Sequence, residues 1–195
     1  MRHQAHILAT LLLGVLLGGT LAGPPRLRAQ AGEGVMSEKE VDALRDAAYE
    51  PLGRIAAYVK ILDDRQRWID DLVHGPKHLS TPDDLHDAID QFAQIADELN
   101  DNLDQLAQRH RDVRKALPKL VEATERWSTS LRAAAEDEHF NVVRRIALDA
   151  VKDTRQIAVQ LKTDQEAYFK AHPEAEKAEN DRRNAPHAPT ARGEH

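Results

Sequence analysis

Apolar residues recur at intervals of three and four through most of this chain. One series runs from residue 41 to 73, a second from 85 to 131 and a third from 140 to 168. This spacing keeps apolar side chains on one face of an α-helix, whereas a half-buried strand needs strict alternation. No strand-like alternation occurs after residue 31. The sequence therefore predicts an all-α fold.

Start and stop signals divide these series into helices. Residues 37–40 read Ser-Glu-Lys-Glu, a capping box that predicts a helix start. Pro51 lies inside the first series, so we expect it either to kink this helix or to separate a short first segment. The glycine–proline pair at residues 75–76 predicts the helix end. Thr81, followed by proline, predicts the next start, because threonine caps helices and proline fits the first helical position.

The number of helices between residues 82 and 135 depends on charge. Apolar spacing continues in phase throughout, which permits one long helix kinked at Pro118. Residues 83–104, however, hold eight acidic residues and no lysine or arginine, while residues 109–119 hold five basic residues and one acid. A reversal near residues 107–112 sets these stretches side by side, although exposed ion pairs contribute only about 0–1 kcal/mol each. We predict an antiparallel four-helix bundle, with an elongated three-helix bundle as the alternative.

The domain limits follow from the ends of the helical pattern. The last helix is predicted from about residue 137 to His172, where the following proline ends it. Residues 173–195 are charged and carry almost no large apolar residue, so we expect a disordered tail. Residues 32–36 are expected to form a short disordered N-terminal segment. The predicted bundle domain spans residues 37–172.

The first 31 residues resemble a secretory signal peptide. Arg2 and the amino terminus give a positive start, residues 7–22 are uncharged and mainly apolar, and Ala31 ends an Ala-x-Ala cleavage motif. Cleavage after Ala22 is the second candidate position. As an uncleaved anchor, the apolar run of about 16 residues would reach only ~24 Å, less than the ~30 Å hydrocarbon core. We therefore expect a periplasmic or secreted protein with no integral membrane span after cleavage.

Charge and cysteine content exclude several classes of function. The formal net charge is −6, and residues 1–31 include three arginines but no acid, so the mature chain is more acidic still. This acidity argues against a nucleic-acid partner and against adhesion to anionic lipid. The chain has no cysteine, which excludes disulfides, thiol catalysis, cysteine zinc sites and covalent haem attachment. No serine nucleophile motif or glycine-rich phosphate loop occurs, so we expect no catalytic residues and no cofactor.

Histidines around the first predicted interhelical turn are candidate metal ligands. His74, His78 and His86 lie near two aspartates, and imidazole and carboxylate groups bind zinc or copper. The glycine–proline pair prevents His74 and His78 from sharing a helical face, so ordinary turn composition is the favoured interpretation. A bundle that binds a divalent metal ion is the alternative function.

Two further histidine positions are weaker candidates. Residues 136–139 contain one Glu-x-x-His pattern, whereas a diiron bundle needs this pattern on two helices. His110 falls in phase with the apolar residues, which favours a partly buried side chain over a metal ligand. Neither position carries a function by itself.

The tryptophans differ in their expected roles. Trp127 lies on the apolar face and is predicted to be a core residue. Trp68 lies beside that face, and a half-exposed tryptophan is a candidate contact residue. The sequence therefore favours a non-enzymatic interaction, scaffold or chaperone-like module with an unknown protein partner. A homo-oligomer is one form that such an interaction can take.

Overall fold

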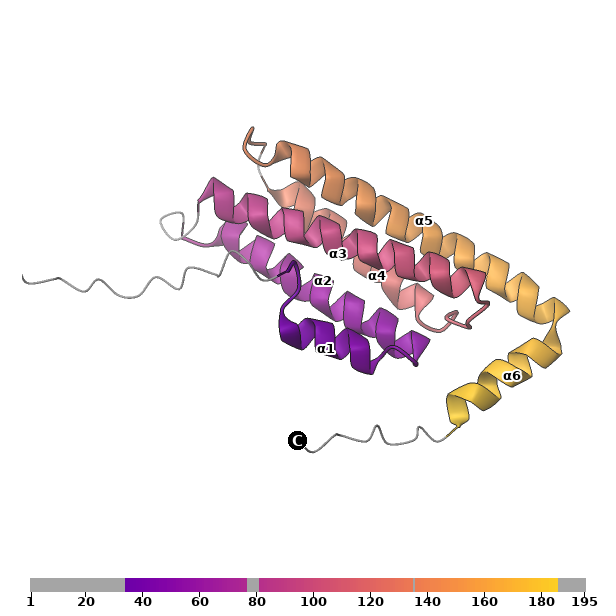
Figure 1. Cartoon of the computed structure of the whole chain (residues 1–195). Helices are drawn as coiled ribbons and strands as arrows, with labels where there is room; N and C mark the ends of the chain where they lie inside the picture. The colour runs from indigo at the N-terminus through magenta and orange to yellow at the C-terminus, as the bar shows by residue number, and fades with distance from the viewer. Residues whose placement is uncertain (1–33, 77–80, 135, 186–195) are drawn as a thin grey trace, which may run out of the picture. The chain divides into compact units, whose positions relative to one another are not determined.

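The computed structural model describes residues 34–76, 81–134 and 136–185, and every regular element in them is an α-helix (Figure 1). The all-α bundle prediction is confirmed. The helices are α1 (Glu38–Asp46), α2 (Pro51–His74), α3 (Pro82–Gln108), α4 (Leu117–Ala133), α5 (Asn141–Ala171) and α6 (Pro173–Asn184). The predicted signal peptide, with both cleavage positions Ala22 and Ala31, lies outside the described residues. None of the helices in the described ranges is long and apolar enough to cross a bilayer.

The predicted helix starts coincide with side-chain caps. The Glu40 amide donates to the Ser37 hydroxyl, and the Ser37 amide donates to the Glu40 carboxylate at 2.8 Å. Thr81 and Asp84 repeat this reciprocal arrangement at the start of α3. Pro51 is the first residue of α2, so it separates the short α1 from the main helix rather than kinking a continuous one.

The chain reverses between α3 and α4, which confirms the two-helix prediction for this stretch. The turn contains no glycine. His110 instead has a φ of 48°, in the left-handed region that favours glycine. Its amide donates to the carbonyl of Ala107, and the Arg111 amide donates to that of Leu106, both at 3.0 Å. These two bonds form a Schellman motif, which ends α3 with histidine in the usual glycine position.

The four long helices form a ring in the order α2, α3, α5, α4 (Figure 1). Long helices that follow one another in the chain run in opposite directions, as predicted. Two pairs of helices that are neighbours in the ring, however, are parallel. Between α2 and α4, the Trp127 indole donates to Asp63 and the Ser130 hydroxyl donates to Asp70, so residue numbers rise together. The same holds between α3 and α5, where Asn100 donates to the Ala150 carbonyl. The turn from α3 to α4 therefore crosses the ring diagonally.

The core consists mainly of the inward apolar side chains of the four long helices, and Met36, Leu44 of α1 and Val113 join it. Trp127 is fully buried, as predicted, and meets Phe92 edge to face with ring centroids 5.8 Å apart. Burying one large apolar side chain contributes roughly 1.5–3 kcal/mol. Because the chain has no cysteine, this packing takes the place of disulfides. The largest fully buried side chains are Trp127, Phe92, Phe169, Ile55, Leu62, Ile69, Ile89, Ile95, Leu99, Leu103, Leu117 and Leu120.

Two predictions of disorder are wrong in part. Within residues 32–36, Val35 packs against the core and Met36 is buried. Within residues 173–195, the first twelve residues form α6. Ion pairs explain why α6 is ordered. This helix has few apolar residues, but its charged side chains pair with those of the turn between α3 and α4. Helix α5 also begins at Asn141, a few residues later than predicted.

Candidate functional site

The structure does not bring the described histidine candidates together. His74 is exposed at the end of α2, and His86 lies in α3 with its Nδ1 3.5 Å from the carboxylate of Asp87. His78 lies outside the described residues. Within the described ranges, no group of three or more histidine and carboxylate side chains is placed to hold a metal ion. The metal-binding alternative therefore has no geometric support in this part of the chain.

The two remaining histidine positions have local partners. His139 Nδ1 lies 2.7 Å from the carboxylate of Asp137; this hydrogen bond raises the pKa of His139. Hydrogen bonds from the amide and side chain of His139 lower the pKa of Asp137. The expected partial burial of His110 is wrong, because the side chain is exposed at the turn and its ring stacks on Tyr168 at a centroid distance of 4.0 Å.

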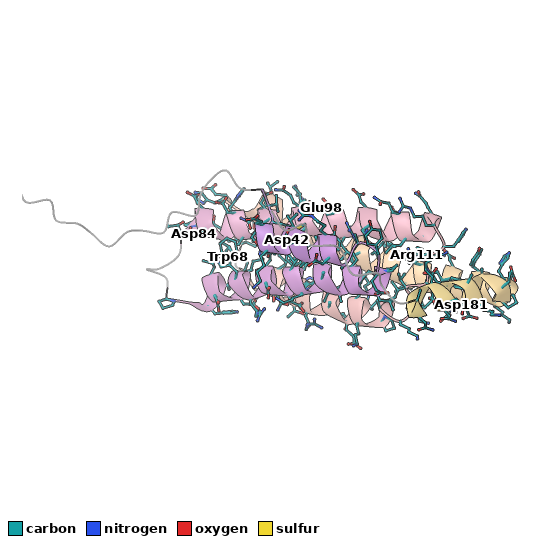
Figure 2. All side chains as sticks on the ribbon, turned by 60° about the horizontal axis from the view of Figure 1, so that its bottom comes forward. Asp42, Trp68, Asp84, Glu98, Arg111 and Asp181 are labelled. Carbon is teal, nitrogen blue, oxygen red and sulfur yellow. The ribbon has the colours of Figure 1, made fainter. Side chains whose placement is uncertain are left out.

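Trp68 is on α2 and is 38% exposed, which agrees with the half-exposed position expected from the sequence. Figure 2 shows it near the end of the bundle where α3 begins, close to the label of Asp84. Its role in an interaction stays a prediction.

An apolar groove lies between the parallel helices α3 and α5. Its apolar lining is Ala107 from α3 with Ile157 and Leu161 from α5. Asp104 on α3 and Asp164 on α5 stand on its opposite walls, together with two glutamines of α5, and its volume is about 310 Å³. This volume lies at the lower end of the range for ligand pockets. We call this feature the α3–α5 groove.

Carboxylates continue from the groove along the two helices. Partial burial of Asp97, together with the negative charges of Asp101 and Asp153, raises the pKa of Asp97. No lysine or arginine of the described residues pairs with these three side chains, or with Asp104 and Asp164 at the groove. These carboxylates thus form no ion pair among the described residues, although the exposed Arg145 and Lys152 lie one helical turn from Asp149 on α5.

Exposed apolar side chains near the start of α5 lie on the side of this helix that carries the groove and the carboxylates. Val142 is 58% exposed and Ile146 is 48% exposed. Steps of three and four residues lead from them to Asp149 and Asp153, and such steps keep side chains on one helical face. We define the α3–α5 face as the groove, the carboxylates at positions 97, 101, 149 and 153, and these two apolar side chains.

The arginines of the turn between α3 and α4 pair with α6. Arg111 Nε donates to Glu179 at 2.8 Å, and Arg114 donates to Glu176 at 2.5 Å. The expected pairing of residues 109–119 with the acids of α3 is therefore wrong, although the chain reversal inferred from it is present. In Figure 2, Arg111 lies toward the end of the bundle that α6 covers.

Asp112 is the centre of this charged end, and its side chain is only 6% exposed. It accepts hydrogen bonds from the Arg114 side chain at 2.9 Å and from Arg183 of α6 at 3.3 Å. Burial alone would raise the pKa of Asp112, but these bonds lower it. Gln165 of α5 also holds the turn, since its amide donates to the Arg111 carbonyl at 2.7 Å. These polar groups are thus already engaged in holding the turn and α6.

Sequence reasoning identified the acidic stretch of α3 but missed the α5 side of this surface. Asp153 and Asp164 are ordinary exposed residues in the helical pattern, and only the parallel contact with α3 gives them a shared site. Comparison of the chain with protein-family models, with curated proteins and with solved structures finds no match.

Proposed function

We propose that this protein is a non-enzymatic interaction module that acts in the periplasm or after secretion, and that it binds a protein partner through the α3–α5 face. The observation that carries the proposal is the α3–α5 groove, in which Ile157 and Leu161 lie between the carboxylates of Asp104 and Asp164. Apolar surface surrounded by polar groups is typical of protein interfaces. Carboxylates that form no ion pair within the described part of the chain lie at the edge of this groove, and such an edge favours a binding protein of opposite charge.

Three buried hydroxyl groups of the bundle have structural partners, whereas the buried Oδ1 of Asn102 has none among the described residues. The buried hydroxyl groups of Thr124 and Thr154 donate to backbone carbonyls of their own helices. Ser130 donates to Asp70 and thereby joins α4 to α2. Because these buried groups have structural partners, they are poor candidates for chemistry on a substrate.

Site-specific photo-cross-linking in the native cells tests the proposal. A photoreactive amino acid is placed at Gln160, in the groove, or at Glu122, which is exposed on α4 outside the α3–α5 face. We expect a discrete protein adduct from position 160 and none from position 122. Absence of an adduct at 160, or equal labelling at both positions, would contradict binding at this face.

Export is tested separately by cell fractionation and by the mass of the mature chain. We expect an extracytoplasmic protein whose first residue follows Ala31 or Ala22. An intact chain in the cytoplasm would contradict the proposed location, but it would leave the cross-linking result unaffected.

A further inference from the structure

We propose that the occupant of the α3–α5 groove is an amphipathic helix of a partner protein, with lysine or arginine residues flanking its apolar stripe. This inference rests on the proposed function and specifies the chemistry of the partner. Three observations support it: the geometry of the groove, the carboxylates on its two walls, and the exposed apolar side chains that continue the face along α5.

The geometry fits a helix. Two neighbouring parallel helices leave a seam, and a third helix packs into such a seam at an interaxial distance of about 8–10 Å. From Val142 to Asp164 the face extends about 33 Å along α5 at ~1.5 Å per residue. At one end lie the partly buried Ala107 and Ile157, together with Leu161, which is only 5% exposed, and at the other end lie the exposed Val142 and Ile146. A helix of four to six turns would reach both apolar areas.

The charges fit basic residues on both sides of the apolar stripe. Asp104 approaches from α3 and Asp164 from α5, so a helix lying between them would meet a carboxylate on each flank. Farther along, the mutual repulsion of Asp97, Asp101 and Asp153 would be relieved by a cation placed among them. Exposed charge pairs mainly set orientation and association rate, while burial of the apolar stripe supplies the affinity.

The same charges argue against a second copy of this chain as the occupant. A two-fold dimer through the α3–α5 face would bring its carboxylates opposite one another, and like charges in contact disfavour association. Arg111 and Arg114 of the turn between α3 and α4 are not available as partners, because they are already paired with acids of α6. A basic helix from another protein meets neither obstacle.

A peptide-binding measurement on the full mature chain tests the inference. The probe is a fluorescent amphipathic peptide of about 18 residues, ~27 Å as a helix, with a leucine stripe flanked by lysines. One control peptide replaces the lysines with glutamates. A second control keeps the composition but scrambles the order, which destroys the stripe and preserves the charge. Fluorescence anisotropy at physiological salt gives each dissociation constant. We expect the basic amphipathic peptide to bind about tenfold or more tightly than either control.

Paired variants locate the binding site. Asp104→Asn with Asp164→Asn is expected to weaken binding of the basic peptide about tenfold, because it removes a charge from each wall. Asp71→Asn with Glu122→Gln removes the same charge from exposed positions outside the face, and should change the affinity less than about twofold. All four positions are exposed, and circular dichroism checks that each variant is folded.

The outcomes separate the two proposals. Equal binding of the scrambled peptide, or equal effects of the two paired variants, would overturn the basic-helix inference. Suppose that the peptide results contradict the inference but the photoreactive residue at position 160 still gives a protein adduct in cells. The α3–α5 face then remains the binding surface, and only the proposed chemistry of the partner is wrong. If position 160 yields no adduct and no peptide binds, the proposed function fails as well.

Discussion

Helix α6 is held to the bundle mainly by charge, so a single neutral substitution is expected to increase the frequency at which it opens. Glu179 has a side chain that is 6% exposed, and it accepts a hydrogen bond from Arg111 Nε at 2.8 Å. Glu179→Gln keeps the shape but removes the negative charge, which leaves Arg111 without its counter-ion and also removes the pair of Glu179 with the more exposed Arg182 of α6. A charge-assisted hydrogen bond contributes about 1.5–3 kcal/mol. Because the Arg111 side chain is 22% exposed, water reduces the loss, and we expect about 1–2 kcal/mol.

The assay is amide hydrogen exchange at neutral pH, followed by mass spectrometry. A loss of about 1–2 kcal/mol corresponds to a roughly 5- to 30-fold increase in the opening of α6. Exchange should accelerate by this factor in Pro173–Asn184 and stay unchanged in α3. Glu174→Gln is the matched control, since Glu174 is exposed in the first turn of the same helix. Unchanged exchange in α6, or equal acceleration throughout the bundle, would refute the reasoning.

Three further substitutions test local features of the fold. His110→Gly is expected to raise the unfolding free energy by about 1 kcal/mol in urea titrations, because a φ of 48° strains a non-glycine residue; a decrease would show that stacking on Tyr168 outweighs the strain. Trp127→Phe should lower it by about 2 kcal/mol, since it deletes the 2.7 Å bond to Asp63 and leaves a cavity; an unchanged value would contradict the contact. The lowered pKa of Asp112 means that its stabilising contribution is complete above its usual value of 3.8 and is lost as the pH falls through the folded-state pKa. The destabilisation caused by Asp112→Asn should therefore be largest at pH 7 and should shrink progressively as the pH falls below 3.8, and an effect independent of pH would contradict the shift.

Local signals in the sequence predicted most of the helices. The capping boxes at Ser37 and Thr81 start α1 and α3 at the expected residues. These signals work because each cap satisfies amides within three residues of itself, so no distant contact is needed. The turn after α3 was harder to place, because His110 occupies a position where glycine is the usual signal.

Distant contacts explain what the sequence missed. Helix α6 depends on ion pairs such as that of Glu179 with Arg111, which lie 68 residues apart in the chain. Composition alone treats the same segment as too polar to order itself. The ring order of the helices is likewise a property of packing, since the apolar stripes fit several arrangements. The α5 half of the candidate site, Asp153 and Asp164, became recognisable only with that order.

The parallel direction of α3 and α5 gives their shared face a polarity as well as a charge. Each α-helix carries the equivalent of about half a positive charge at its N-terminus and half a negative charge at its C-terminus. In a ring of purely antiparallel neighbours these ends would cancel, but here the C-terminal ends of α3 and α5 lie on the same side of the bundle, where Arg109 at the C-cap of α3 and Lys170 in the last turn of α5 offset only part of their negative charge. A helix bound in the seam is therefore stabilised with its own N-terminus toward the α6 end. The two orientations of a bound segment are thus unequal in energy even before any side chain is compared.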